Sequence, residues 1–174
     1  MKKILLIIFS FIILATQALA ENLNSASISL ETKFFAKIIN LSTSISNPKV
    51  GIVFEPSSSS SATYKRKLIN YLNTYEIEAI SVPVSSVEQA KSHGINIFYL
   101  SKGLNSIDHV ARIARRDKIL TFSSDLNFVE EGYSSVSVGI NNSGKPKILI
   151  NLTNLKKEGN SFSAKLLRLS NVIN

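Results

Sequence analysis

The sequence contains no cysteine and has only two histidines, His93 and His109. Without cysteine there are no disulfides, so the folded chain must be stabilised by its core. The same absence excludes a lipid-modified cysteine, and together with the scarcity of histidine it argues against a transition-metal site. His93 precedes Gly94, where a histidine can bond the last carbonyls of a helix, and His109 falls on an expected polar helix face. Neither position requires a catalytic role.

Motifs of the common enzyme classes are also missing. The serine run at 57–61 lacks the glycines and the lysine of a phosphate-binding loop, and no serine lies in a nucleophile elbow. Glu130 and Glu131 are adjacent, and an exposed acidic loop explains them better than an acid–base pair. We therefore expect a binding protein without a cofactor, not an enzyme. A hydrolase is the weakest alternative.

The one long apolar run lies at the start of the chain. Lys2 and Lys3 precede apolar residues 4–15, and Ala18-Leu19-Ala20 provides a small-x-small cleavage site. This pattern is typical of a secretory signal peptide, because it is too short and wrongly flanked for a membrane span. We expect residues 1–20 to be removed and residues 21–174 to form a single periplasmic domain.

The chain is basic, with a formal net charge of +8 among its 174 residues. The basic side chains are scattered along the sequence, and solvated helix faces account for most of them. An anionic lipid surface or an acidic partner is the alternative. No aromatic and basic residues combine into a platform, so we expect no nucleic-acid partner.

Strands and helices alternate along the first two thirds of the expected domain. Apolar spacing predicts helices near residues 28–41, 64–75 and 104–114. A capping box from Ser85 to Glu88 predicts a further helix that Gly94 closes. Short apolar runs predict strands at residues 50–54, 77–84, 95–100 and 119–122. The fold class is therefore α/β, a three-layer α/β/α flavodoxin-like arrangement with a mostly parallel sheet of five or six strands.

The last third of the chain departs from this alternation. Residues 136–140 and 147–152 predict an antiparallel hairpin, joined through Asn141-Asn142-Ser143-Gly144, which is good turn chemistry. A terminal helix is expected from about Ser161 to the end of the chain. Its apolar face would cover the edge of the sheet and consists of Phe162, Leu166, Leu169 and Ile173.

Polar loops follow three of the predicted parallel strands. In an open parallel sheet these loops meet beyond the carboxyl ends of the strands, where ligands bind. Their hydroxyls, one ammonium and carboxylates could hold a small polar or anionic ligand, although turns are rich in serine for structural reasons alone. The candidate ligand-binding residues are Ser57, Ser58, Ser101, Lys102, Ser123 and Asp125.

The C-terminal third resembles the close of the YfiR-like family of periplasmic proteins. A loop with Phe128 and Gly132 leads to a strand, then to Ile150-Asn151-Leu152, and then to a Ser-x-Lys-Leu-Leu-x-Leu helix at residues 163–169. The chain lacks the cysteines of the best-studied members, so disulfide-based redox control is not expected here. Packing alone is an alternative role for these residues.

The resemblance implies a repressor that binds the sensor domain of an inner-membrane diguanylate cyclase, lowers cyclic-di-GMP output and thereby affects biofilm formation. The resemblance is also compatible with a homodimer of this chain. The candidate partner-binding residues are Phe128, Tyr133, Asn151, Lys165 and Arg168.

Residues 49–140 are also similar to one lobe of the periplasmic solute-binding proteins of ABC importers. This second resemblance implies an alternative function, a single-lobe solute-binding protein that uses the serine-lined crevice. One lobe cannot close on a solute as two lobes do. The length of the expected domain therefore favours the regulator.

Overall fold

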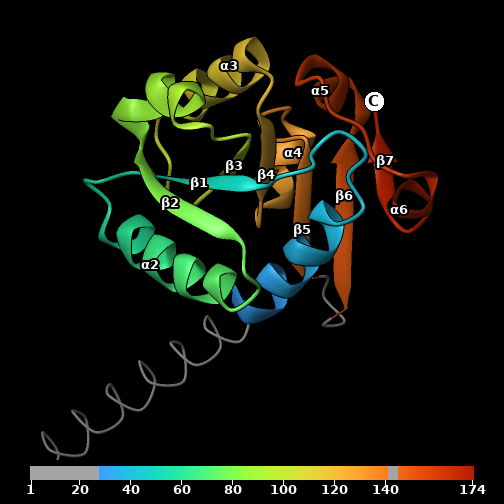
Figure 1. Cartoon of the computed structure of the whole chain (residues 1–174), viewed down its shortest axis with the longest axis horizontal. Helices are drawn as coiled ribbons and strands as arrows, with labels where there is room; N and C mark the ends of the chain where they lie inside the picture. Colours follow the sequence, from blue (N-terminus) through green and yellow to red (C-terminus); the bar gives the residue numbers. More distant parts are fainter. Residues whose placement is uncertain (1–27, 141–144) are drawn as a thin grey trace, which may run out of the picture.

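A sheet of seven strands runs through the computed structural model, which describes residues 28–140 and 145–174 (Figure 1). The strand order is β2-β1-β3-β4-β5-β6-β7. Strands β1 to β5 are parallel, β6 is antiparallel to β5, and β7 is parallel to β6. The strands are β1 (Lys49–Phe54), β2 (Glu78–Pro83), β3 (Ile97–Leu100), β4 (Leu120–Ser123), β5 (Val136–Ile140), β6 (Pro146–Asn151) and β7 (Asn171–Ile173).

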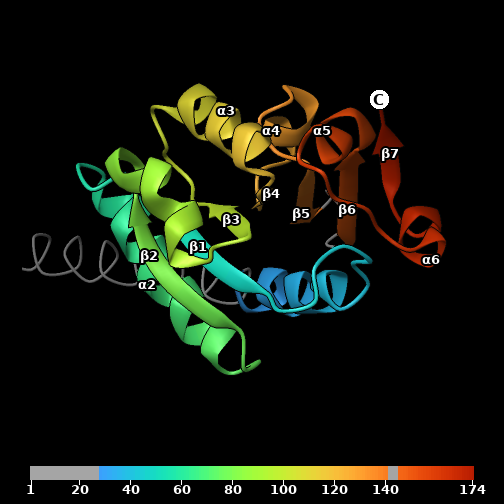
Figure 2. The ribbon, with the colours of Figure 1, turned by 45° about the horizontal axis from the view of Figure 1, so that its top comes forward.

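Helices cover both faces of the sheet and give three layers (Figures 1 and 2). One face packs against a helix at residues 28–39, hereafter the 28–39 helix, and against α2, and the other packs against η1 and α3. The remaining helices are short. The named helices are α2 (Ser59–Asn73), the 3₁₀ helix η1 (Val84–His93), α3 (Ile107–Asp117), α4 (Leu126–Glu130), α5 (Leu152–Lys157) and α6 (Ala164–Arg168).

Alternate residues of the central strands enter two separate cores. In β3, Ile97 and Tyr99 face the 28–39 helix and α2, whereas Phe98 and Leu100 face η1 and α3. All four are fully buried, which explains why the strand is a continuous apolar run rather than an alternating one. The expected α/β class, the three layers and the mostly parallel sheet are confirmed, with seven strands instead of five or six.

The expected capping box at Ser85 is wrong. The segment after β2 is a 3₁₀ helix that begins at Val84, so Ser85 is already inside it and cannot cap its start. Pro83 occupies the cap position, and no side chain bonds there. The end of the segment agrees with the prediction, because Gly94 adopts a left-handed conformation and its amide donates to the carbonyls of Ala90 and Lys91.

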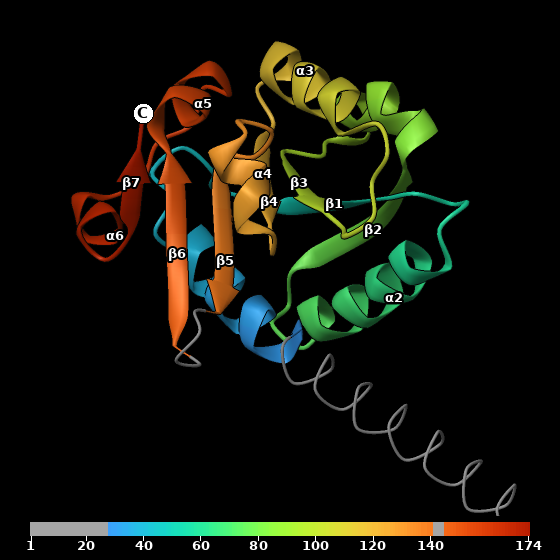
Figure 3. The ribbon, with the colours of Figure 1, turned by 180° about the vertical axis from the view of Figure 1, so that it is seen from behind.

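The terminal helix is shorter than expected, and the chain ends in a strand. Helix α6 stops at Arg168, and the segment after it pairs with β6 as β7 (Figure 3). The predicted apolar face therefore divides, with Phe162 and Leu166 buried and Leu169 67% exposed. The open edge of β6 explains the difference, because its free backbone groups bond the last residues better than another helical turn would.

Two expectations fall outside the described residues: the signal peptide at 1–20 and the turn Asn141-Asn142-Ser143-Gly144. Of the helices in the described ranges, none combines the length and the apolar character needed to cross a bilayer.

Candidate functional site

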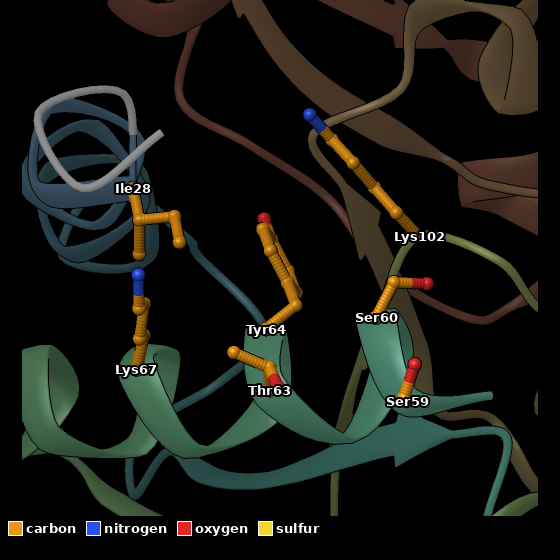
Figure 4. Close-up of a pocket in the computed structure, with 7 residues that line it drawn as sticks. All are labelled: Ile28, Ser59, Ser60, Thr63, Tyr64, Lys67 and Lys102. Atoms are coloured by element: carbon orange, nitrogen blue, oxygen red, sulfur yellow. The ribbon is translucent and has the colours of Figure 1, made fainter. Parts of the chain in front are cut away.

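A pocket of about 360 Å³ lies beside α2, close to the point where the strand order reverses. Strand β1 has β2 on one side and β3 on the other, so the loops after β1 and β3 diverge there and leave room for a ligand. Figure 4 shows the side chains of Lys67 and Lys102 on either side of Tyr64. The lining residues are Ile28, Ser59, Ser60, Thr63, Tyr64, Lys67 and Lys102.

The serines after β1 and β3 bond mainly to each other. Ser61 Oγ lies 2.7 Å from Ser101 Oγ, and both residues are fully buried. Ser61 Oγ also accepts a bond from the Glu55 amide at 2.9 Å, and Ser58 is the N-cap of α2. Ser57 Oγ donates to Glu55 Oε1 at 3.0 Å. These hydroxyls hold the loop after β1 in place and fix the start of α2.

The loop after β4 is likewise internally bonded. Ser123 Oγ accepts from the amide of Asp125 at 2.9 Å, and Asp125 is the N-cap of α4, accepting from the amide of Asn127 at 3.0 Å. Of the six candidate ligand-binding residues, Lys102 alone lines the pocket. Ile28 of the 28–39 helix supplies one further wall, and the others come from one face of α2. Sequence reasoning missed that face, although Ser60, Thr63 and Lys67 have the spacing of three and four that brings side chains together on a helix.

Tyr64 connects the pocket to a buried polar cluster. Its hydroxyl donates to Glu31 Oε2 at 2.7 Å and lies 3.0 Å from Ser124 Oγ and 3.4 Å from the Tyr99 hydroxyl. Burial, followed by the charge of Glu31, raises the pKa of Tyr64 well above its ordinary value. Tyr64 is therefore neutral, and its hydroxyl is fixed as a donor to the carboxylate.

A second buried carboxylate, Glu158, joins the end of α5 to the sheet. Its side chain accepts from the Thr121 amide at 2.9 Å, from Thr121 Oγ1 at 2.6 Å and from Ser135 Oγ at 2.6 Å. Glu158 is 1% exposed. Burial raises its pKa to about 7, against the opposing effect of these three hydrogen bonds and of the nearby Arg115 charge.

The segment from Phe128 to Gly132 is attached to the same region, and Phe128 lies in helix α4 rather than in the expected loop. Arg115 Nη2 donates to the Gly132 carbonyl and to Asn154 Oδ1, the latter at 3.3 Å, and Asn154 Nδ2 donates to the Gly132 carbonyl at 2.6 Å. Asn151 caps α5 by accepting from the amide of Asn154 at 3.0 Å. Its Nδ2 donates to the carbonyl of Val129 at 3.3 Å. Asn151 therefore bonds to backbone groups on two sides of this turn.

The five candidate partner-binding residues do not form one surface. Phe128 and Tyr133 are half-buried and meet edge to face, with ring centroids 6.4 Å apart. Asn151 is buried, and Lys165 and Arg168 are exposed on α6. Figure 3 shows α4 against β4 and β5, whereas α6 lies at the outer end of the sheet beyond β6.

An exposed apolar surface lies beside α6 and β7. Among the described residues, the large hydrophobic side chains that are exposed are Tyr75, Leu169 and Val172, at 40%, 67% and 39%. Two of the three therefore belong to the last turn of α6 and to β7. We call Lys165, Arg168, Leu169 and Val172 the C-terminal edge. Residues 159–174 contain no aspartate or glutamate, so this surface is basic as well as apolar.

The described residues contain no group of three or more histidine, aspartate or glutamate side chains that could hold a metal ion. The pocket, with its hydroxyls and ammonium groups, is suited to binding, and the C-terminal edge is suited to protein contact.

Comparison with known families decides the assignment, because the YfiR/HmsC-like family model matches residues 33–171. The chain belongs to the YfiR/HmsC-like family. The resemblance identified from the C-terminal residues is thereby confirmed, and the match extends over both layers of helices. The family is regulatory, non-enzymatic and periplasmic, which supports those properties for this chain. None of the curated proteins matches the sequence.

Solved structures show where the YfiR/HmsC-like fold recurs. A conserved domain protein from Vibrio cholerae has a TM-score of 0.65 at 13% identity, covering 84% of this chain and 60% of that one. An ABC domain in complex with L-Trp from Streptococcus pneumonia has a TM-score of 0.66 at 13% identity, with coverages of 84% and 62%. CD0873, a substrate binding protein with adhesive properties from Clostridium difficile, has a TM-score of 0.64 at 16% identity, with coverages of 83% and 58%.

At these identities the similarity concerns the fold, which is that of solute-binding-protein-like domains. The chain spans about three fifths of the length of each of these structures. The ligand and the substrate binding named for those structures belong to those proteins and are not assigned to this chain.

Proposed function

We propose that this chain is an exported regulator that binds the periplasmic sensor domain of an inner-membrane diguanylate cyclase and lowers its output of cyclic-di-GMP. The observation that carries the proposal is the family match over residues 33–171, because the family is regulatory and periplasmic. In this role the protein acts by contact, and biofilm formation is the process that changes when the contact is lost.

The C-terminal edge supplies the contact surface in this proposal. Strand β7 pairs with β6 on one side, and in the described part of the chain no strand pairs with its other side. Exposed Leu169 and Val172 offer apolar area at that edge, and Lys165 and Arg168 add positive charge. A strand edge of this kind binds an extended segment through backbone hydrogen bonds. The charge favours a sensor domain that presents acidic side chains.

A pull-down from native membranes tests the proposal directly. The tagged protein is isolated from the exported fraction, incubated with detergent-solubilised native membranes, and the retained proteins are identified by mass spectrometry. We expect a membrane protein with a cytoplasmic diguanylate cyclase domain. Capture should be lost with Leu169→Glu combined with Val172→Glu, which place charge on the apolar edge. The matched control is Tyr75→Glu, at a hydrophobic residue next to α2 that is as exposed as Val172. If capture is equal for all three proteins, the C-terminal edge is not the contact surface.

A second candidate function is single-lobe solute binding for an ABC-type importer. The pocket beside α2 favours it, because it lies where open parallel sheets bind ligands. The same pull-down separates the two functions, since retention of an importer's membrane subunits in place of a cyclase would support solute delivery and contradict the regulator.

A further inference from the structure

We propose that a basic surface at the ends of three helices holds this protein against a bilayer that contains anionic phospholipids. We call it the helix-end surface, and it consists of five exposed residues, Lys91, Arg116, Lys118, Lys156 and Lys157. The proposal goes beyond the regulatory function, because it concerns phosphate headgroups and is tested on the isolated protein with synthetic vesicles.

Two hydrogen bonds bring these helix ends together. Lys91 Nζ donates to the carbonyl of Asp117 at 2.8 Å, which joins the end of η1 to the end of α3. Lys118 Nζ donates to the carbonyl of Lys157 at 2.8 Å, which joins the end of α3 to the end of α5. Figures 1 and 2 both show α3 and α5 side by side. Cations from three separate parts of the sequence therefore share one side of the molecule.

The helix ends explain why basic residues collect here. Each of the three helices carries a basic residue in its last turn, and Lys118 is the C-cap residue of α3. Cations are stabilised at such ends, because the last carbonyls of a helix have no partner within it and carry a partial negative charge. This charge is only about half an elementary charge for each helix, so five full positive charges leave the surface positive.

The fold also separates the charges of two mixed segments of the sequence. Residues 116–118 and 156–158 each contain one acidic residue among basic ones. In the structure Glu158 is buried, and the side chain of Asp117 is 14% exposed, with its Oδ1 2.7 Å from Arg116 Nε. The basic residues of both segments are exposed. The acidic side chains are thus turned inwards and the basic ones outwards, so this surface is more positive than the sequence suggests.

Glu88 marks the limit of the helix-end surface. It is an exposed acidic residue of η1, three positions before Lys91, and its Oε1 lies 3.8 Å from Nε2 of His109 on α3. Its negative charge repels phosphate headgroups. The membrane contact is therefore centred on the ends of α3 and α5, and α5 is the first choice for substitution.

Positive charge without large apolar side chains fits a phospholipid surface better than a protein. A protein interface usually has a core of large hydrophobic side chains within a polar rim. In the described part of the chain, the large hydrophobic residues that are exposed are Tyr75, Leu169 and Val172, and none belongs to the helix-end surface. Ammonium groups on flexible stems adapt to headgroups, which have no fixed pattern, and each one near an anionic bilayer raises the affinity about fivefold.

Sedimentation with synthetic vesicles tests the proposal. Protein purified from the exported fraction is mixed with vesicles of phosphatidylcholine alone, or of phosphatidylcholine and phosphatidylglycerol in equal parts. We expect saturable binding to the vesicles that contain phosphatidylglycerol, at least about tenfold tighter than binding to neutral vesicles. Raising the salt concentration from about 0.1 M to about 1 M shortens the Debye length from about 10 Å to about 3 Å and should release the protein.

Two double variants with the same change in net charge locate the contact. Lys156→Gln with Lys157→Gln removes two cations from the helix-end surface and should weaken vesicle binding at least about tenfold. The matched control is Lys33→Gln with Lys37→Gln, since both lysines are exposed on the 28–39 helix, at the other side of the molecule (Figure 2). The affinity of the control should stay within about twofold of that of the unchanged protein. Urea denaturation checks that both variants are folded.

A second pair of substitutions repeats the test from the other two helices. Lys91→Gln with Arg116→Gln should also weaken vesicle binding, and it replaces the α5 variant if that protein is not folded. Four results would overturn the proposal: no saturable binding to phosphatidylglycerol vesicles, equal affinity for neutral vesicles, equal effects of the α5 variant and the control, or binding to poly-glutamate in place of vesicles. The last result would mean that the helix-end surface binds an acidic protein. The cyclase pull-down uses solubilised membranes without a bilayer, so the two proposals fail separately.

Discussion

Two carboxylates are buried in the described part of the chain, Glu31 near the pocket and Glu158 near the C-terminus, and their surroundings differ. Glu158 is enclosed by Thr121 and Ser135, which supply an amide and two hydroxyls as donors. Glu31 accepts from a tyrosine whose ring forms a pocket wall. Glu158 therefore holds a helix to the sheet, whereas Glu31 holds one helix to another and fixes the ring of Tyr64 at the wall of the pocket.

The difference follows from the secondary-structure elements that carry the two carboxylates. Glu158 is the residue after the last turn of α5. Its carboxylate oxygens accept hydrogen bonds from β4 and from the segment before β5, and so hold α5 to both. Because α5 leads directly to α6 and β7, the same bonds position the C-terminal edge. Glu31 lies on the 28–39 helix and Tyr64 on α2, so their hydrogen bond joins two helices on one face of the sheet.

Removing the Glu158 carboxylate should produce the largest loss of stability. Glu158→Ala leaves the Thr121 amide and two hydroxyl donors buried without an acceptor, which should lower the free energy of unfolding by about 4 kcal/mol at pH 5. Urea denaturation measures the change. The control is Glu131→Ala, an exposed glutamate after α4, with an expected change within about 0.5 kcal/mol. Equal effects of the two substitutions would show that Glu158 does not join α5 to the sheet.

The pH dependence of stability should show the second-largest effect. The pKa of Glu158 is raised from 4.5 to about 7 in the folded protein. Between these values the unfolded chain loses the Glu158 proton and the folded chain keeps it, so stability falls as pH rises from about 4.5 to about 7 and is level above that. This raised pKa corresponds to up to about 3 kcal/mol in the free energy of unfolding.

Glu158→Gln is the variant that isolates this pH effect. The amide keeps the size of the side chain and one acceptor oxygen but cannot ionise, so the difference in unfolding free energy between pH 5 and pH 8 should shrink by about 2.5 kcal/mol. An unchanged pH profile in this variant would assign the titration to another group and would remove the contrast between the two carboxylates.

The parallel part of the fold could be predicted from the sequence, and the C-terminal part could not. Residues 50–54 and 95–100 are apolar runs between helical segments, and such local patterns decide strand type wherever both faces are covered. Strand β7 is three residues long and exists because β6 offers an open edge, which is a non-local cause. For this reason the sequence predicted a helix to the end of the chain.

The candidate sites divide in the same way, into residues that local sequence patterns predict and residues that depend on packing. Lys102 was found because it follows a strand, whereas the wall on α2 required the orientation of that helix. Glu158 stands in the sequence Lys156-Lys157-Glu158-Gly159, which reads as a solvated charged run. Only the packing of α5 against β4 buries it.

Tyr64→Phe tests the pocket side of the comparison, with a smaller effect than the Glu158 variants. The change removes the donor to Glu31 and keeps the ring, so the free energy of unfolding should fall by about 1.5 kcal/mol. Urea denaturation measures the change. Tyr71→Phe, at a half-buried tyrosine of the same helix, is the control for stability. An unchanged free energy of unfolding would mean that this hydroxyl does not hold α2 to the 28–39 helix.

Leu169→Ala should have the smallest effect on stability. It tests the C-terminal edge, which the Glu158 bonds position. Leu169 is 67% exposed, so its truncation should change the free energy of unfolding by less than about 0.5 kcal/mol. Leu166, one turn earlier in α6, is 1% exposed and is the matched control, with an expected loss of about 3 kcal/mol on change to Ala. Urea denaturation of both variants, followed by the membrane pull-down, gives the comparison. A stable Leu169→Ala protein with weakened capture would assign the side chain to a partner. If the two leucines prove equally costly to truncate, Leu169 belongs to the core and the C-terminal edge is not available for contact.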